Sequence, residues 1–416
     1  NAANAYPLLP MERSKYLLFQ QYSLMEALYD SPFYWMTDDK EYRPKANIHR
    51  GAFTEEFSAE RLSKVFGKSR VHSNVKLKES KGKVAGEIDV LVLFGDRAIV
   101  LQAKSKRLTL EARKGNDLRI KDDFKKSVED SYEQALRCAK GIGNPALSVR
   151  SGDGSEVAIP AKLKEIYIFC VVSDHYPALA FQSRQFLKVE ATELITPPFI
   201  MDVFTLDAIT EMLASPLRFS SYVNRRTRYT EKLLVTHELT ILSYHLKRNL
   251  WLDEKYDMVW LEDDIAADLD AAMTVRREGF PGRDTPDGIL TRFAGTAVGR
   301  LVEAIERTPE PAVLSLGFML LTLSEDSVRA VSEGIEAILK AFRRDQQHHD
   351  VTVAIGEGDT GITVHCNGDP NAVAVPRLDN YCRNRKYAQK VGSWFGVCLS
   401  SHGTPRFGVS LEYEWK

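Results

Sequence analysis

The sequence predicts an α/β protein: a central mixed β-sheet flanked by helices, then a mostly helical region and a small α+β module. The first observation behind this fold class is a pair of almost wholly apolar runs on either side of Gly95-Asp96, a dipeptide suited to a tight hairpin turn. Strands that are apolar on both faces lie in the middle of a covered sheet. The second is the order of helix-like and strand-like patterns around this hairpin, α-β-β-β-α-β, which gives an α/β sandwich over residues 49–205.

Length and composition limit the function classes without selecting one. The 416 residues suffice for two or three domains. With 44% hydrophobic and 27% charged residues, the chain has the composition of an ordinary soluble protein. A net charge of −1 provides no global basic field, so nucleic-acid binding would need a local patch. The expected parts are an N-terminal helical and aromatic segment (1–48), the α/β domain (49–205), a helical region (206–284) and the α+β module (285–416).

Cysteine usage and hydropathy indicate the cellular compartment in which the protein is expected. Five cysteines are scattered along the chain, with no C-x-x-C pair and no Cys/His spacing typical of zinc. Such a set is expected to be buried thiols in a reducing cytoplasm. No apolar run reaches ~18 residues and no secretory signal is visible, so we expect no membrane span and a cytoplasmic location.

Two segments outside the α/β domain are expected to be helical. Residues 11–29 carry a broad apolar surface at helical spacing, which we expect to pack on a later domain. Residues 222–250 are expected to form one long helix with Arg225, Arg226 and Arg228 in its first turns.

A helix over residues 52–66, ending before Gly67, is expected to supply one acidic side chain to the sheet. Its core stripe includes Ala59, and a step of four residues back from Ala59 gives Glu55. A carboxylate on a buried stripe is costly unless it is paired or bound to a cation, so Glu55 is a candidate site residue. In the alternative interpretation the helix is slightly rotated and Glu55 lies at its solvated border; Glu56 is expected to be solvated.

The hairpin itself gathers polar side chains at one end. Counting outward from the turn, Asp89 lies opposite Gln102 and Glu87 lies opposite Lys104. Because side chains alternate along a strand, these four are expected to project from one face, with Ile88 on the other face. Charged groups at the end of an otherwise apolar strand pair require a functional explanation.

That explanation is metal-assisted phosphodiester hydrolysis. Asp89, Glu55 and either the Gln102 amide oxygen or the Ala103 carbonyl can bind a hard cation such as Mg²⁺ (or Mn²⁺), which prefers oxygen ligands. Such a cation polarises a phosphoryl oxygen and lowers the pKa of a bound water. Lys104 would orient that water and neutralise the charge that develops at phosphorus.

Neighbouring residues are expected to support this chemistry. Glu87 would either join the metal site or pair with Lys104, and Gln134 lies near the site on a helix that begins at Asp122. The segment that follows the hairpin is strongly basic, and we expect it to contact phosphates, with a solvated loop as the alternative. Its candidate nucleic-acid-binding residues are Lys106, Arg107, Arg113 and Lys114.

The arrangement resembles the PD-(D/E)XK nuclease superfamily, which has the restriction-endonuclease-like fold. It is most similar to the groups with a Q-x-K variant, the Mrr-like and nuclease-related-domain (NERD-like) proteins. The similarity covers about residues 49–175, and one departure is that Gln102 stands where an acid is more usual, although the Q-x-K groups include active nucleases. The matching motifs, in the family's order, are RG-x-x-x-E at 50–55, GEID at 86–89, QAK at 102–104 and YEQA at 132–135.

The resemblance implies a metal-dependent endonuclease that acts on DNA, with a role in antiviral defence against foreign DNA. Cutting both strands would favour a homodimer or higher oligomer. Two alternatives remain: a catalytically inactive nucleic-acid-binding or assembly module on the same fold, which Gln102 favours, and an unrelated partner-binding scaffold.

Overall fold

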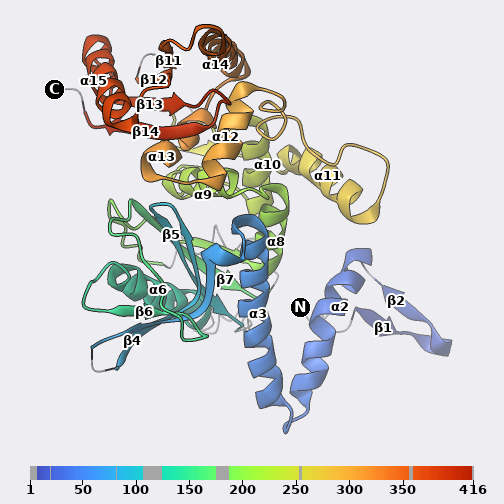
Figure 1. Ribbon diagram of the computed structural model, residues 1–416. Coiled ribbons are helices and arrows are strands. Elements are labelled where there is room, and N and C mark those ends of the chain that lie inside the picture. Colours follow the sequence, from blue (N-terminus) through green and yellow to red (C-terminus); the bar gives the residue numbers. More distant parts are fainter. Residues whose placement is uncertain are drawn as a thin grey trace. The chain divides into compact units, whose positions relative to one another are not determined.

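A six-stranded mixed β-sheet with helices on both faces forms the centre of the N-terminal half of the chain in the computed structural model (Figure 1). The structure describes residues 7–18, 20–80, 82–105, 124–174, 187–252, 255–355 and 359–414, without the side chain of residue 126. The chain divides into two compact units, Asn1–Leu93 with Ala98–Thr210, and Phe94–Arg97 with Glu211–Lys416. The division after Thr210 lies close to the expected boundary after residue 205, and the expected parts 206–284 and 285–416 both fall mainly in the second unit.

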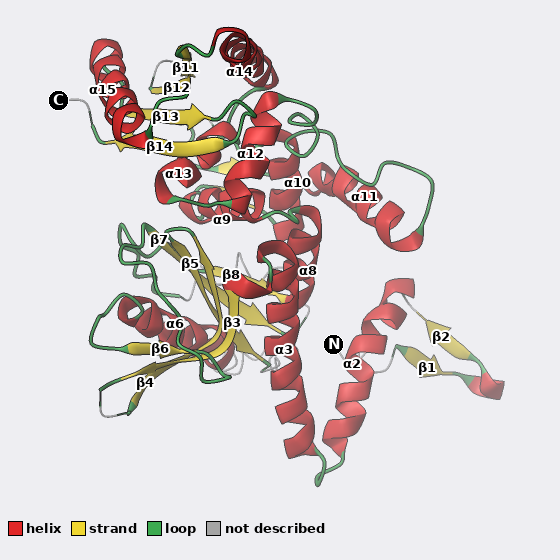
Figure 2. Ribbon diagram, in the orientation of Figure 1, coloured by secondary structure: helices red, strands yellow, loops and turns green. Residues whose placement is uncertain are grey.

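The sheet of the first unit has the strand order β6-β3-β4-β5-β7-β8. β3 pairs antiparallel with β4 and β6, whereas β7 and β8 are parallel, so the predicted mixed sheet is confirmed. Helix α3 (Arg43–Phe66) covers one face and α6 (Asp130–Gly141), which continues a π-helical turn at Lys125–Glu129, covers the other (Figure 2). The strands are β3 (Val71–Lys78), β4 (Val84–Phe94), β5 (Arg97–Lys104), β6 (Ser148–Arg150), β7 (Glu165–Val172) and β8 (Phe199–Asp202).

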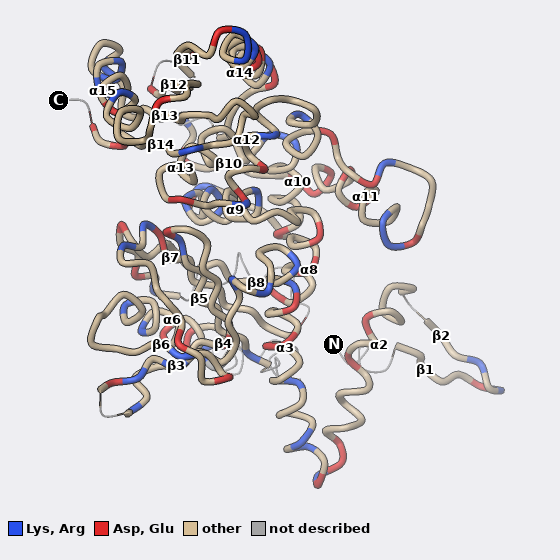
Figure 3. The backbone as a smooth tube through the Cα atoms, viewed as in Figure 1, with Lys and Arg blue, Asp and Glu red and all other residues tan. Residues whose placement is uncertain are grey.

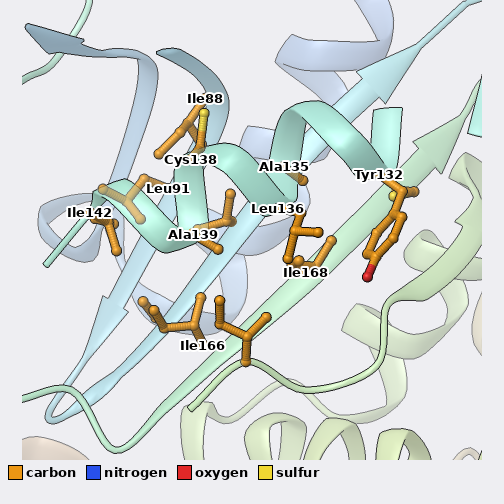
Figure 4. Close-up of a cluster of buried hydrophobic side chains, with 14 of the residues drawn as sticks. Ile88, Leu91, Tyr132, Ala135, Leu136, Cys138, Ala139, Ile142, Ile166 and Ile168 are labelled. Atoms are coloured by element: carbon orange, nitrogen blue, oxygen red, sulfur yellow. The ribbon is translucent and has the colours of Figure 1, made fainter. Parts of the chain in front are cut away.

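The core between the sheet and α6 reveals a break in the alternation of β4. Ile88 and Leu91 both pack in this core with Ala135 and Cys138 of α6 (Figure 4). Strict alternation would place residues three positions apart on opposite faces. The prediction that Ile88 lies on the face opposite Leu91 is therefore wrong, and the irregularity lies between them.

Helix α3 is longer than expected and is rotated relative to the predicted stripe. Its buried residues step by four along the helix, so the stripe passes one position before Glu55 and Ala59. Glu55 lies at the border of this stripe and is partly buried, whereas Glu56 is exposed. The rotated interpretation of the helix is the correct one. The stripe consists of Ala46, Arg50, Thr54, Ser58 and Leu62 and ends with Val65 and Phe66.

The N-terminal segment differs from the expected helix over residues 11–29. It forms a small antiparallel pair, β1 (Leu8–Pro10) and β2 (Tyr16–Leu18), around a 3₁₀ turn, and then helix α2 (Gln21–Asp38). The apolar surface expected to pack on a later domain is largely exposed, with Met25 and Leu28 at 68% and 69%.

The second unit contains a four-stranded sheet, order β11-β12-β13-β14, in which β12 and β13 are parallel and the other pairs are antiparallel. The strands are β11 (His349–Ile355), β12 (Thr360–Cys366), β13 (Ser393–Leu399) and β14 (Pro405–Glu412). The helices are α9 (Pro216–Arg228), α10 (Glu238–Arg248), α11 (Ala267–Glu278), α12 (Ala297–Arg307), α13 (Pro311–Leu320), α14 (Glu325–Asp345) and α15 (Asn371–Gln389), and α8 (Val203–Met212) runs across the division between the units.

The structure tests three further sequence predictions. The single helix expected over residues 222–250 is wrong, because the two-residue strand β9 (Leu233–Leu234) separates α9 from α10 and pairs with β10 (Val259–Trp260). All five cysteines are buried and free of disulfides, as expected. Within the described ranges, no helix has the length and apolar character required to span a membrane.

Candidate functional site

An irregularity in the β3–β4 pairing lies at Asp89. The register joins Ser73 to Val90 and Val75 to Ile88, and the intervening pair of Asn74 and Asp89 is missing. Asn74 has a φ of 53°, the left-handed conformation that Asn tolerates better than most residues. The side-chain alternation of β4 also changes between Ile88 and Leu91. The strand is therefore locally distorted at the acidic residue of the hairpin, as is common next to functional sites.

Asp89 is connected directly to the neighbouring strand. Its Oδ2 accepts a hydrogen bond of 2.7 Å from the backbone N–H of Ala103. Burial raises the pKa of the Asp89 carboxyl and the charge of Glu87 raises it further, while the Ala103 N–H and the charge of Lys104 lower it. Burial outweighs the two stabilising contacts, so an additional cation would stabilise the ionised carboxylate.

Glu55 of α3 lies within electrostatic reach of the hairpin. Burial raises the pKa of Glu55, the charge of Asp89 raises it further, and the charge of Lys104 opposes both. The charges of Asp89 on β4 and Lys104 on β5 therefore both act on Glu55 of α3. The adjacent Glu56 is exposed and contributes only a smaller repulsion.

Lys104 is held by a residue of α6. Its Nζ donates to Oε1 of Gln134 at 3.1 Å, which places Gln134 at the site as expected. Tyr132 of the same helix is buried, and its hydroxyl bonds instead to the backbone of Glu190. Gln134 thus holds the Lys104 ammonium from the α6 face of the sheet. The charge of Lys104 lowers the pKa of Glu55, which belongs to α3 on the other face.

Gln102 is fully buried and its amide is only half satisfied. Nε2 donates to the backbone oxygen of Glu87 at 2.6 Å. Oε1 is buried and has no hydrogen-bond partner among the described residues. The bond to Glu87 gives a physical reason for the departure from an acid: a carboxylate at this position would face a carbonyl oxygen and could not donate to it.

The Glu87 carboxylate has a partner other than Lys104. It pairs with Lys76 of β3 at 3.4 Å and is 55% exposed, so the expected pairing with Lys104 is wrong. The backbone oxygen of Glu87 is what lies at the site. It accepts hydrogen bonds from the side chains of Gln102, Gln134 and Cys138 at 2.6, 3.3 and 3.3 Å. Glu87 therefore supports the site through its main chain.

A second network, to which sequence reasoning assigned no role, fixes α3 against the sheet. Arg50 is 8% exposed; its Nε donates to Ser173 Oγ at 2.9 Å and its Nη2 pairs with Asp174 at 3.0 Å. The guanidinium also lies over the rings of Tyr29 and Phe33. The N–H of Ser173, just beyond β7, in turn donates to the oxygen of Lys104. Arg50 is thus a positioning residue, and the RG-x-x-x-E pattern was its only sequence signal.

The predicted nucleic-acid-binding residues Lys106, Arg107, Arg113 and Lys114 lie outside the described residues. The described part of the site consists of residues of α3, β4, β5 and α6.

The donor set fits a hard divalent cation in part. Two partly buried carboxylates with raised pKa values lie near each other, and Gln102 Oε1 is a buried oxygen without a partner in the described structure. All three are oxygen ligands of the kind that Mg²⁺ and Mn²⁺ bind. Over the described ranges, no three His, Cys, Asp or Glu side chains gather as a metal centre, so the candidate site relies on two carboxylates and an amide.

Comparison of the chain with known proteins returned no match: no family model, no curated protein and no solved structure is similar to it. The functional argument therefore rests on the site geometry.

Proposed function

We propose that the first unit is a metal-dependent nuclease that hydrolyses phosphodiester bonds, with DNA as the expected substrate and a restriction-endonuclease-like fold as its framework. The observation that carries this proposal is that three different elements bring Glu55, Asp89 and Lys104 within electrostatic range, with Asp89 bonded to the Ala103 N–H and Lys104 bonded to Gln134. A bound Mg²⁺ or Mn²⁺ would supply Lewis acidity and an acidified water.

The residues of the chain would divide the remaining work. Asp89 and Glu55 provide negative charge to hold the cation, and Gln102 Oε1 is available as a neutral third oxygen. Lys104 carries a positive charge to the place where negative charge develops on the phosphoryl oxygens. Gln134 orients the Lys104 ammonium through its Oε1, and the N–H of Ala103 fixes the Asp89 carboxylate. Cutting both strands would require two such sites, hence a homodimer.

A second candidate function is a nucleic-acid-binding module that has lost catalysis. Gln102 is the observation that favours it, because a neutral amide whose Nε2 is committed to Glu87 holds a cation less strongly than a carboxylate would.

The test is cleavage of labelled DNA and RNA duplexes and single strands with Mg²⁺ or Mn²⁺ by the wild type and by Lys104→Met. We expect cleavage of DNA, reduced about 10²-fold or more in Lys104→Met because a charge that stabilises the transition state is lost. Lys64→Met, at a 57% exposed lysine of α3, is the matched control and should retain wild-type activity. Salt-sensitive DNA binding with no cleavage would favour the inactive module. Cleavage that survives Lys104→Met unchanged would disprove the proposal.

A further inference from the structure

A large concave pocket in the second unit is lined by four basic and two acidic side chains. It has a volume of about 1030 Å³ and is formed by the end of α10, the segment after residue 286, the start of α14 and one residue of α9. Its basic side chains include Arg225, Arg248 and Arg292. Figure 3 shows Lys and Arg residues along α9, the helix to which Arg225 belongs.

Among the described residues, these arginines form no ion pair with a carboxylate. Nε of Arg225 donates to the backbone oxygen of Asn249 at 2.8 Å, and Nη1 of Arg292 donates to the backbone oxygen of Leu323 at 2.9 Å. Within the described part of the chain, neither they nor Arg248 form an ion pair with a carboxylate, whereas Lys247 at the same pocket pairs with Asp268 at 2.7 Å.

The surroundings make the positive charges of this pocket unfavourable in the absence of a ligand. Burial lowers the pKa of Arg225 and of Arg292, so both charges are partly desolvated. Glu325, whose charge opposes this shift at Arg292, is 78% exposed and lies 3.9 Å from Arg329. Burial and the charges of the two arginines lower the pKa of the nearby His245 to about 3, so this histidine is neutral. An anion would relieve the repulsion.

The start of α14 adds favourable dipoles. This helix has 21 residues, and Ser324 at its N-cap accepts a hydrogen bond from the N–H of Ser327 at 3.2 Å. Both serines line the pocket. The N-terminus of a long helix attracts phosphate groups through its backbone N–H groups and its macrodipole.

Asn249 supplies independent evidence for a ligand. It is 4% exposed, lines the pocket and adopts a left-handed conformation with a φ of 53° at the C-cap of α10. Its Nδ2 donates to the backbone oxygen of Leu321 at 2.8 Å, but its Oδ1 is buried without a hydrogen-bond partner in the described structure. A buried acceptor is expected to have a donor, and this unsatisfied oxygen belongs to a residue of the pocket wall.

The exposed Trp251 indicates what else the ligand contains. Its side chain is 62% exposed at the same pocket and offers a flat surface for a nucleobase. The pocket volume is that of a small-molecule site rather than of a long groove for a polymer. We propose that this pocket binds a nucleotide, with its phosphates at Arg225, Arg248, Arg292 and the start of α14 and its base at Trp251.

The proposal is tested by calorimetric titration of the full chain with pyrophosphate, ATP and a short single-stranded oligonucleotide, in EDTA to suppress metal-dependent binding elsewhere. One pyrophosphate or ATP per chain is expected to bind. Arg292→Gln and the exposed Arg248→Gln should each weaken both ligands about tenfold, because each removes a charge-assisted contact. Trp251→Ala should weaken ATP about fivefold and leave pyrophosphate unchanged. Arg307→Gln, at a 77% exposed arginine of the same unit outside the pocket, is the control and should change nothing.

Three results would overturn it. The first is the absence of binding of both pyrophosphate and ATP at about 1 mM. The second is binding that Arg248→Gln and Arg292→Gln leave unchanged, with both variants folded by circular dichroism. The third is an oligonucleotide that binds more tightly than ATP and loses affinity in the same variants, which would assign the pocket to nucleic acid.

Discussion

The hairpin end of the first unit and the pocket of the second unit both leave charges incompletely compensated, but with opposite sign. At the hairpin, burial keeps the pKa values of Glu55 and Asp89 raised despite the nearby Lys104. At the pocket, Arg225 and Arg292 donate to backbone oxygens and form no ion pair with a carboxylate of the described residues. This difference in sign is the reason why we propose a cation as the ligand of the first region and a phosphate as the ligand of the second.

A third group of charged residues, in the second unit, is fully paired. Arg226 and Glu238 are almost completely buried and form a two-pronged pair at 2.7 and 2.8 Å, and the Tyr222 hydroxyl donates to the same carboxylate at 2.7 Å. Such a network has no capacity left for a ligand, so its role is structural.

The largest effect is expected from Asp89→Asn. The substitution removes the charge that holds the cation but retains an oxygen that can accept from the Ala103 N–H. DNA cleavage should fall about 10³-fold while the thermal melting temperature changes little. A variant that cleaves within about tenfold of the wild type would exclude Asp89 from the proposed site.

Glu238→Gln should act on stability. Loss of the carboxylate leaves Arg226 buried without its counter-charge, so the free energy of unfolding of the second unit should fall by about 3–5 kcal/mol in urea titrations. Glu303→Gln, which breaks an exposed pair with Arg307, should cost no more than about 1 kcal/mol. Equal effects of the two substitutions would contradict the structural role of the buried network.

Gln102→Glu should be destabilising in the absence of metal, by about 1–3 kcal/mol, because a carboxylate would face the Glu87 oxygen that Nε2 now satisfies. Addition of Mn²⁺ should recover part of this loss. Urea unfolding with and without Mn²⁺ measures both effects. A variant as stable as the wild type without metal would show that the hydrogen bond to Glu87 does not explain the glutamine.

The smallest effect is expected in the pH dependence of stability. Asp89 and Glu55 have raised pKa values, so the folded state binds their protons more tightly than the unfolded state does. The free energy of unfolding should therefore decrease as pH rises from the ordinary acid range through the raised pKa values, and this contribution should be present below that window. Urea titrations across about pH 4–7 in EDTA should show a shallower decrease for Asp89→Asn. An identical pH dependence in the two proteins would contradict the assigned shift.

The sequence predicted the mixed sheet and most of the candidate site because their signals are local. Asp89, Gln102 and Lys104 belong to one hairpin, whose turn position follows from Gly95-Asp96. The distortion at Asp89 was missed, because it depends on the left-handed conformation of Asn74 in the neighbouring strand. The rotation of α3 was left open, because stripes through Thr54 and Glu55 differ by one residue.

The pocket of the second unit could not be predicted in the same way. Its arginines come from different elements, and two of them, Arg225 and Arg248, were assigned to one continuous helix. The strand pairing of β9 with β10, which separates α9 from α10, is a tertiary contact without a strong local pattern. Only the folded chain brings Arg225, Asn249 and Arg292 together.

The most direct test of the proposed metal site compares two adjacent glutamates of α3. Glu55 lies at the site and Glu56 is exposed, so Glu55→Gln and Glu56→Gln make the same chemical change in two environments. The rate of DNA cleavage is measured against Mn²⁺ concentration for both variants and the wild type. We predict that Glu55→Gln requires about tenfold more Mn²⁺ for half-maximal activity, whereas Glu56→Gln matches the wild type. Identical metal dependence in all three proteins would contradict the proposed site.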